Sequence, residues 1–387
     1  MKNFEFHNPT KIVFGADTVA KLSTLVPQDA RVLILYGGAS AEKTGTLAEV
    51  RAALAQGQRS VREFGGIEPN PSYETLMRAV ALVRSEKSDF LLAVGGGSVI
   101  DGTKFVAAAA LYDGEPWEIA ERGGANVQRA LPFGTVLTLP ATGSEMNSGG
   151  VVTKKATHDK LSFRNPLLYP QFSVLDPSKT FTLPATQVAN GVVDAFVHTT
   201  EQYLTYPVQA MVQDRFAEGL LQTLVEIAPQ AVASPDDYAT RANLMWTATL
   251  ALNGLIGAGV PQDWATHMIG HELTALYDID HARTLALVLP ALLDVQREQK
   301  RGKLLQYGER VWNITQGSED ERIDAAIART RTFFEGLGIP TRLSAYQLGQ
   351  EAVEAVLKQL EVHGMTALGE HRDIDLARSR RILEAAL

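Results

Sequence analysis

The sequence predicts an α/β domain built around a parallel sheet, followed by an all-helical domain. In the first half, short apolar runs that end in glycine or proline alternate with helical stretches. This pattern is typical of strands that are buried on both faces and covered by helices. After about residue 184 the strand pattern fades and apolar residues recur at helical spacing. At 387 residues the chain is long enough for two domains, which we expect at 1–184 and 185–387.

Three apolar runs are expected to form strands of the parallel sheet: 31–36, 89–94 and 134–139. Helices are expected between them, at 73–87 and at 99–111, and Asn70-Pro71 precedes the first helix as a start signal. The repeated order of strand, glycine turn and helix favours parallel pairing.

The first sixteen residues predict a small hairpin. Phe4 and Phe6 alternate, a turn is expected at 8–10, and the apolar run 11–14 leads into Gly15. The hairpin of residues 1–16 either covers its own domain or pairs across a dimer axis, because exposed strand edges attract partners.

Eight segments of the second half carry helical spacing of apolar residues. They are 187–203, 211–233, 235–254, 262–277, 287–300, 301–312, 318–337 and 349–363.

Composition excludes several classes of protein. With 45% hydrophobic and 21% charged residues, the chain is typical of a soluble globular protein. A net charge of -8 argues against a nucleic-acid or anionic-membrane partner. The absence of cysteine excludes disulfides, a thiol nucleophile and cysteine-bound zinc. Because the first nine residues form no apolar signal core, the expected location is the cytoplasm.

Four metal-binding side chains punctuate the second half: Asp194, His198, His267 and His281. Asp194 and His198 lie four residues apart on a predicted helix, so both leave the same face, about 6 Å apart along the axis. Three imidazoles and one carboxylate suit Zn²⁺ or Fe²⁺ and leave room for a substrate oxygen. The alternatives are an ordinary hydrogen-bonded pair and histidines satisfied within a core. A metal site is favoured because a lone carboxylate is costly inside an apolar helix.

Gly95-Gly96-Gly97-Ser98 follows a predicted strand and precedes a predicted helix. Glycines let the backbone approach a ligand closely, and the free N–H groups of a helix start attract a pyrophosphate. The run has neither the spaced dinucleotide fingerprint nor a P-loop lysine, so a simple tight turn is the alternative. Its position at the carboxyl end of a parallel strand favours nucleotide binding.

A second polar loop follows the strand at 134–139. It carries Thr138, Thr142 and Asn147, although hydroxyl side chains also favour ordinary capped loops. Two such loops at one sheet edge fit a dinucleotide. Lys160 is a candidate for a ribose or phosphate contact, and a solvated surface lysine is the alternative.

The turn after the first strand indicates which nicotinamide cofactor binds. Gly37, Gly38 and Ser40 lie in this turn, and no acidic residue occurs before Glu42. An acidic side chain there would bind a ribose 2′-OH and repel a 2′-phosphate. Because the turn is small and neutral, with Ser40 and Lys43 able to meet phosphate oxygens, we predict NADP(H).

These motifs, in this order, resemble the iron-containing (group III) alcohol dehydrogenases. The resemblance covers essentially the whole chain and rests on five motifs: Gly95–Asp101, Ala141–Glu145, Asp194-x3-His198, His267-x3-His271 and His281. The chain looks most like the branch of NADPH-dependent aldehyde reductases and butanol dehydrogenases. The resemblance implies a dehydroquinate synthase-like architecture with an active site between a dinucleotide-binding and a metal-binding domain. It also implies a homodimer joined through the N-terminal strands.

The resemblance assigns roles to individual residues of this sequence. The metal ligands would be Asp194, His198, His267 and His281. The pyrophosphate would bind at Gly95, Gly96, Gly97 and Ser98. The remaining cofactor contacts would come from Asp101, Thr138, Thr142, Asn147 and Lys160. His271 matches a histidine near the substrate that is no ligand, and it is expected either to relay a proton or to support its neighbours.

Two positions depart from the family pattern. Many members have glycine after the last ligand, where this chain has Ala282, and the loop before Gly143 is shorter than the common form. Both departures affect the shape of the substrate pocket. The metal is expected to be iron or zinc, because the resemblance to this branch leaves zinc open despite the family name.

The predicted reaction is the reversible reduction of an aldehyde to a primary alcohol by NADPH at a divalent ion. A glycerol or polyol dehydrogenase of the same fold is the nearest alternative. A dehydroquinate synthase-type lyase is disfavoured, because its anionic substrate needs a basic cluster and the segments 190–202 and 260–276 contain no Lys or Arg. A non-catalytic nucleotide-binding or metal-storage protein would consume no NADPH with any aldehyde.

Overall fold

The computed structural model describes residues 1–387, which form two compact units. We call residues 7–184 and 234–249 the α/β unit, and residues 1–6, 185–233 and 250–387 the helical unit. The predicted fold class, an α/β domain with a parallel sheet and a helical domain, is confirmed.

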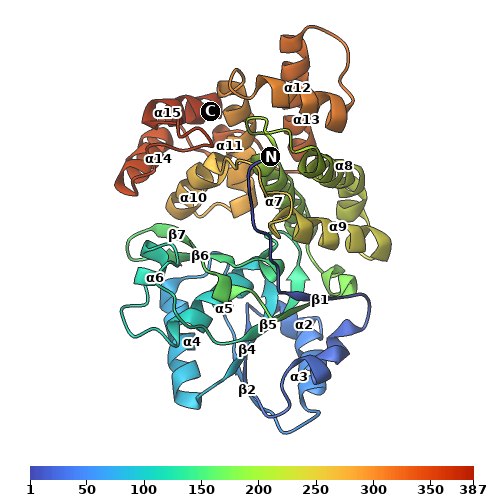
Figure 1. The fold of residues 1–387 in the computed structure, drawn as a ribbon, viewed down its shortest axis with the longest axis vertical. Coiled ribbons are helices and arrows are strands. Elements are labelled where there is room, and N and C mark those ends of the chain that lie inside the picture. Colours follow the sequence, from blue (N-terminus) through green and yellow to red (C-terminus); the bar gives the residue numbers. More distant parts are fainter. The chain divides into compact units, whose positions relative to one another are not determined.

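The α/β unit contains a six-stranded sheet in the order β1-β8-β5-β4-β2-β3, in which all neighbours are parallel. The strands are β1 (Lys11–Phe14), β2 (Arg31–Tyr36), β3 (Ser60–Phe64), β4 (Phe90–Gly96), β5 (Phe133–Leu139) and β8 (Phe172–Leu175). The helices of this unit are α1 (Leu22–Leu25), α2 (Ser40–Lys43), α3 (Thr46–Leu54), α4 (Tyr73–Glu86), α5 (Gly97–Ala109) and α6 (Glu118–Glu121) (Figure 1). An antiparallel hairpin of β6 (Gly149–Lys154) and β7 (Asp159–Arg164) completes it.

Alternate residues of β2 enter two separate cores, as expected for a strand covered on both faces. Leu33 and Leu35 pack in one core with residues of α4 and α5. Val32 and Ile34 pack in the other with residues of α1 and α3. The continuous apolar run in the sequence therefore reflects burial on both sides of the sheet.

The order of the strands creates a topological switch point. β2 lies between β3 and β4. The chain therefore passes from β2 to its neighbour β3 at the edge of the sheet and then crosses back to β4, the neighbour of β2 on the other side. Ligands of open α/β sheets bind outside the carboxyl ends of the strands at such a point. Here those carboxyl ends are Tyr36 and Gly96, which lead into Gly37 and Gly97.

The predicted N-terminal hairpin is wrong. Residues 1–10 form no strand, and β1 pairs in parallel with β8, some 160 residues away along the chain. Instead of turning back, the segment is anchored elsewhere: Lys2 N donates to Gly259 O, and Asn8 Nδ2 donates to Met146 O at 2.8 Å. Asn8 Oδ1 also accepts from Thr10 N, which uses the turn for a local cap rather than for pairing.

Two segments belong to the opposite units from those predicted. Met1–Phe6 lies with the helical unit, and Ser234–Thr249, most of α9 (Tyr238–Ala251), lies with the α/β unit. The reason for the second is packing: Met245 is part of a core of the α/β unit, and Thr249 Oγ1 donates to Glu145 Oε1 at 2.5 Å.

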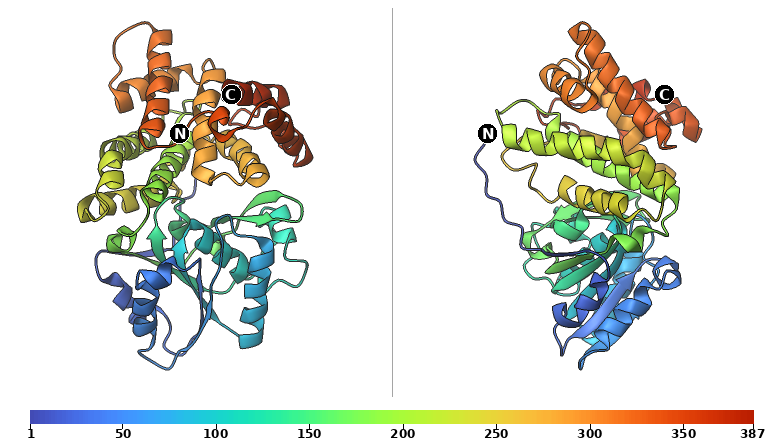
Figure 2. Two further views of the ribbon diagram at one scale, coloured as in Figure 1. Left: turned by 180° about the vertical axis from the view of Figure 1, so that it is seen from behind. Right: turned by 90° about the vertical axis from the view of Figure 1, so that its right-hand side faces the viewer.

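The helical unit contains the remaining helices. They are α7 (Ala185–Tyr203), α8 (Met211–Ala233), α10 (Ala265–Tyr277), α11 (His281–Val295), α12 (Arg301–Trp312), α13 (Glu319–Gly336), α14 (Gln350–Val362) and α15 (Leu376–Ala385). α7 is buried along nearly its whole length and runs beside α8 (Figure 2). None of the helices combines the length and the apolar character that a membrane span requires.

Candidate functional site

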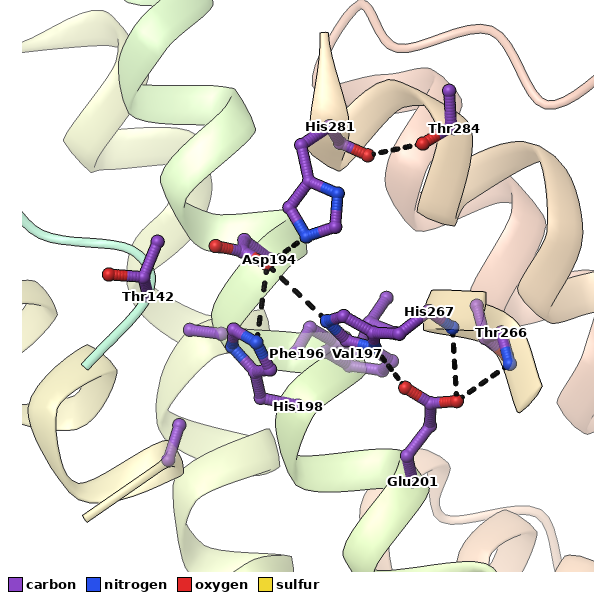
Figure 3. Close-up of polar contacts among 12 residues, drawn as sticks. Thr142, Asp194, Phe196, Val197, His198, Glu201, Thr266, His267, His281 and Thr284 are labelled. Atoms are coloured by element: carbon purple, nitrogen blue, oxygen red, sulfur yellow. Dashed lines mark hydrogen bonds and ion pairs between the residues drawn. The ribbon is translucent and has the colours of Figure 1, made fainter. Parts of the chain in front are cut away.

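One carboxylate oxygen lies at the centre of the helical unit's polar cluster. Asp194 Oδ1, on α7, is 3.6 Å from His198 Nε2, 4.0 Å from His267 Nε2 and 3.8 Å from His281 Nε2 (Figure 3). The two α7 residues share a helix face because of their four-residue spacing. His267 lies on α10 and His281 begins α11, so three helices supply the four side chains. The structure brings together all four residues that the sequence singled out.

The cluster fits a divalent cation. Asp194 Oδ1 is buried and accepts no hydrogen bond, although a buried carboxylate oxygen normally has a donor. Ligand atoms of Asp194, His267 and His281 lie within 4.8 Å of one another. Imidazole nitrogens that converge on an unsatisfied carboxylate oxygen have the donor chemistry that Zn²⁺ and Fe²⁺ prefer. The side chain of His281 is the most exposed of the four, at 23%, so solvent reaches the cluster next to His281.

Glu201 is a residue of this cluster that the sequence patterns did not single out. Its Oε2 bonds to His267 Nδ1, and its Oε1 accepts from the backbone N of Thr266 at 2.7 Å and of His267 at 3.4 Å. This contact commits Nδ1 of His267, so that Nε2 faces Asp194. The signal was present in the sequence: Glu201 follows His198 by three residues and Asp194 by seven, which places all three on one face of α7.

The surroundings of Glu201 make it an unusual carboxyl. Burial, reinforced by the neighbouring Asp263 carboxylate, raises the pKa of Glu201 well above its ordinary value. Asp263 itself pairs with the buried Lys300 at 2.8 Å. The carboxyl group that bonds to His267 therefore lies close to a buried ion pair.

His271 lies beside the cluster and is nearly buried. Its ring centre is 5.1 Å from that of His281 and 6.1 Å from that of His267. The ring of Trp264 lies 5.3 Å from that of His267 and 6.2 Å from that of His198.

The glycine turn of the α/β unit is sterically required. β4 passes directly into α5 at Gly97, and neither Gly96 nor Gly97 has a positive φ. A Cβ on Gly97 would lie 2.4 Å from Thr142 Cγ2, and one on Gly96 would lie 3.0 Å from Leu139 Cβ. A Cβ on Gly95 would lie 2.5 Å from Val99 Cγ2. The glycines thus allow close packing of the strand, the helix and the following loop. The thirteen-residue helix that begins here has no acidic side chain in its first turn, so its free N–H groups can attract an anion.

The loop after β2 lies next to this turn. A Cβ on Gly37 would be 3.5 Å from Val99 Cγ2, whereas one on Gly38 would meet nothing within 4 Å. Ser40 and Lys43 are exposed. The acidic neighbour Glu42 is tied away from the turn, because its Oε1 accepts from Arg51 at 2.9 Å.

The other predicted cofactor residues fall into two groups. Ser98, Thr138 and Thr142 are half-buried at the ends of β4 and β5. Asp101, Asn147 and Lys160 instead make internal hydrogen bonds: Asp101 with Ser144 and Val151, Asn147 with Gly143 and Lys104, and Lys160 with Asn70. Lys104, which is fully buried, was not foreseen from the sequence.

A parallel-sheet unit with a glycine turn at its switch point, together with a helical unit that carries a carboxylate–imidazole cluster, defines a class of dehydrogenases. Comparison with known proteins agrees. Residues 9–177 match the family model described as iron-containing alcohol dehydrogenase, and residues 188–387 match that of the Fe-containing alcohol dehydrogenase family, C-terminal. The chain belongs to the iron-containing alcohol dehydrogenase family and is an oxidoreductase.

Relatives of known description match along their whole length. The chain is 63% identical to the NADPH-dependent aldehyde reductase YqhD of Escherichia coli, with 100% of both chains covered. It is 40% identical to a probable NADH-dependent butanol dehydrogenase of Bacillus subtilis, again over 100% of both. Among solved structures, that of E. coli YqhD gives a TM-score of 0.98 at 62% identity, covering 100% of this chain and 99% of the other. The NADH-dependent butanol dehydrogenase A of Thermotoga maritima gives 0.95 at 35% identity, with the same coverage.

Proposed function

We propose that this protein reversibly reduces aldehydes to primary alcohols with NADPH, at a divalent ion of iron or zinc. The observation that carries the proposal is the convergence of three imidazole Nε2 atoms on the buried Asp194 Oδ1, at 3.6 to 4.0 Å. The identity to an NADPH-dependent aldehyde reductase over the full chain supports the substrate and cofactor class.

Several side chains of the helical unit have separate roles in the proposed reduction. Asp194, His198, His267 and His281 would hold the ion, which when bound supplies a Lewis acid for a carbonyl oxygen while NADPH supplies the hydride. Glu201 orients His267 through Nδ1. The ring of Trp264 packs edge-on against the rings of His198 and His267 and would help to hold them in place. His271, beside His281, would donate the proton that completes the alcohol.

NADPH is proposed over NADH because of the turn after β2. Gly38 borders open space, Ser40 and Lys43 are exposed, and Glu42 is held by Arg51. No acidic side chain is therefore free at the turn to repel a 2′-phosphate. Relatives use either cofactor according to their descriptions, so this local chemistry is the argument specific to the chain.

One assay tests the proposal. The absorbance of NADPH and of NADH is followed against a panel of aldehydes and polyols, before and after exhaustive chelation and after return of Fe²⁺ or Zn²⁺. We expect consumption of NADPH with aldehydes, loss of activity on chelation, and recovery with metal. Activity that survives complete metal removal would overturn the metal's role, and a preference for NADH would overturn the interpretation of the turn. A preference for glycerol would favour a polyol dehydrogenase.

Replacement of His271 with alanine tests the proton donor. We expect turnover to fall while bound metal stays at the wild-type ratio, because His271 is proposed to donate a proton from beside His281 and not to hold the ion. Unchanged turnover would remove His271 from the mechanism.

A homodimer is part of the proposal. β1 is an edge strand, and Phe14 at its end is 41% exposed and packs against Trp246, which is 38% exposed. Such an apolar sheet edge favours pairing with a second copy. Light scattering should give twice the chain mass, and Phe14→Lys should shift it toward the monomer; a monomeric wild type would contradict the proposal. The cytoplasmic location stays a prediction for cell fractionation.

A further inference from the structure

Lys104 is a lysine with no exposed surface, on the α5 helix that begins at the glycine turn. Its Nζ donates to three acceptors: Ser144 Oγ at 2.8 Å, Asn147 Oδ1 at 2.9 Å and Gly149 O at 2.6 Å. All three belong to one segment, residues 144–149. An ammonium has three N–H groups, so each is used.

Asp101 holds the same segment from one turn earlier on α5. Its Oδ1 accepts from Ser144 Oγ at 2.6 Å and its Oδ2 accepts from Val151 N at 3.0 Å. A donor and an acceptor on one helix face thus bind residues 144–151 through five hydrogen bonds. We call the side chains of Asp101 and Lys104 the α5 clamp.

The clamp sets the position of the loop at the glycine turn. Asn147 Nδ2 donates to Gly143 O at 2.9 Å, which passes the constraint back toward Thr142. Thr142 packs so closely on Gly97 that a Cβ there would lie 2.4 Å from its Cγ2. A loop released from α5 would therefore change its spacing to the turn.

The buried position of Lys104 works against its charge. Burial lowers the pKa of Lys104 to about 7, which means that the interior disfavours its charge. A buried ion pair is often replaced as a whole by apolar residues without loss of stability, whereas removal of one partner alone is destabilising. An apolar residue at this position would supply none of the three hydrogen bonds that Lys104 donates to residues 144–149.

We propose that Lys104 is a positioning residue for the dinucleotide: it holds residues 144–149 on α5, and this fixes the Thr142 loop at the spacing from the Gly95–Ser98 turn that NADPH binding requires. The inference rests on the proposed function, since it assumes that this turn and loop receive NADPH. Lys104 acts through the loop and need not touch the cofactor.

The test is the dissociation constant of NADPH, measured by fluorescence titration of wild type, Lys104→Met and Ser144→Ala. Lys104→Met keeps the length of the side chain and removes its donors. We expect its dissociation constant to rise about ten-fold, as for loss of one or more net hydrogen bonds. Ser144→Ala removes the one group shared by both halves of the clamp in a change that a fold tolerates easily, and a smaller rise is expected.

Kinetics and a matched control separate positioning from general destabilisation. For Lys104→Met, KM for NADPH should rise with the dissociation constant, while kcat at saturating NADPH and metal content stay near wild type. Lys303→Met removes another buried lysine, which pairs with Asp214 in the helical unit, and NADPH binding should stay unchanged.

Three results would each contradict the proposed role of Lys104. Wild-type affinity in folded Lys104→Met, or in Ser144→Ala if the first variant does not fold, overturns the proposal. An equal loss of affinity in Lys303→Met also overturns it, because the effect would then be general. A wild-type protein that binds no NADPH overturns the cofactor assignment, which the clamp proposal needs.

Discussion

At the scale of single residues, Glu201 orients one imidazole of the cluster around Asp194. An imidazole has two nitrogens, and the partner of one decides what the other faces. Glu201 takes Nδ1 of His267 and, through its second oxygen, two backbone N–H groups at the start of α10. The same carboxylate thus orients the ring and fixes the helix that carries it.

We expect Glu201→Gln to weaken metal binding by about 10- to 100-fold, the range found when partners of metal-binding histidines are removed. A glutamine has one acceptor oxygen where the glutamate uses two, so either His267 or the α10 backbone loses its bond. Competition with a chelator dye measures the dissociation constant. Glu218→Gln is the control, because Glu218 is equally buried but bonds to Tyr203 and Arg310. Equal metal retention in both variants would contradict the role of Glu201.

The spacing of ionisable residues on helices explains which site residues were predictable. Asp194 and His198 stand out because an apolar helix rarely carries both. Glu201 lies one turn further along the same face of α7, and Lys104 lies one turn after Asp101 on α5. A lone acid or lysine in a sequence, however, is ordinarily solvated. Only the structure shows that Lys104 is fully buried and that its three acceptors come from a loop 40 to 45 residues away.

At the scale of elements, the close packing at the junction of β4 and α5 and the proposed binding of NADPH there both require a residue without a side chain at position 97. Gly97 begins the helix against Thr142, and its close contact leaves the first backbone N–H groups accessible. A side chain at this position would push the two loops apart.

We therefore expect Gly97→Ala to reduce NADPH affinity strongly and to lower the unfolding free energy by about 1–3 kcal/mol, as for an overpacked core position. Gly302→Ala is the matched control. A Cβ there meets nothing within 4 Å in helix α12, so it should be neutral or stabilise by about 0.4–1 kcal/mol. Isothermal titration and urea unfolding give both quantities. Wild-type NADPH binding by Gly97→Ala would show that the turn does not hold the cofactor.

The α5 clamp predicts opposite effects of pH on binding and on stability. The folded pKa of Lys104 is about 7 and its ordinary value is 10.5, so the unfolded chain binds more protons between these values. Its contribution to the unfolding free energy therefore rises with pH through that window. A neutral amine, however, has two donors for three acceptors, so NADPH affinity should fall as pH rises past about 7.

The groups that face Lys104 are Asp101, Glu145 and Arg164, and burial also raises the pKa of the two carboxyls. The comparison is made between wild type and Lys104→Met, from one pH unit below the lysine's pKa to one above it. The part of the NADPH pH dependence that comes from Lys104 should be missing in the variant. Identical pH profiles would show that the ammonium is not what the loop requires.

At the scale of the whole molecule, local patterns predicted three of the four inner strands of the sheet. They missed the buried inner strand β8 and failed at the edges of the sheet. The strand expected at 31–36 matches β2, and those expected at 89–94 and 134–139 match β4 and β5 to within two residues. The edge strand β3 was missed because Arg62 and Glu63 interrupt its apolar run. The pairing of β1 with β8 joins residues far apart in the chain, and alternation at Phe4 and Phe6 suggested a local partner instead.

Ionic contacts between residues far apart in the chain could not be predicted from local sequence patterns either, and Lys300 is the clearest example. Its Nζ, almost fully buried, bonds to Leu204 O after α7, to Asp263 before α10 and to Glu370 near the C-terminal helix α15. One ammonium thus satisfies two buried carboxylates from segments that are distant in sequence. Its pKa is raised, since the two carboxylates outweigh the cost of burial, and the stability that it contributes is present at neutral pH and lost only above its ordinary value of 10.5.

We expect Lys300→Met to lower the unfolding free energy by about 3–5 kcal/mol, because it leaves two carboxylates buried without their counter-charge. Urea unfolding at neutral pH, followed by circular dichroism, measures the loss. Lys155→Met is the control: Lys155 pairs with Glu68 but is 63% exposed, so its removal should change stability by less than about 1 kcal/mol. Glu370→Gln in the Lys300→Met background should restore part of the loss, since it removes one of the uncompensated charges. A loss as small as that of Lys155→Met would mean that the carboxylates take up protons at little cost and that Lys300 does not hold the helical unit together.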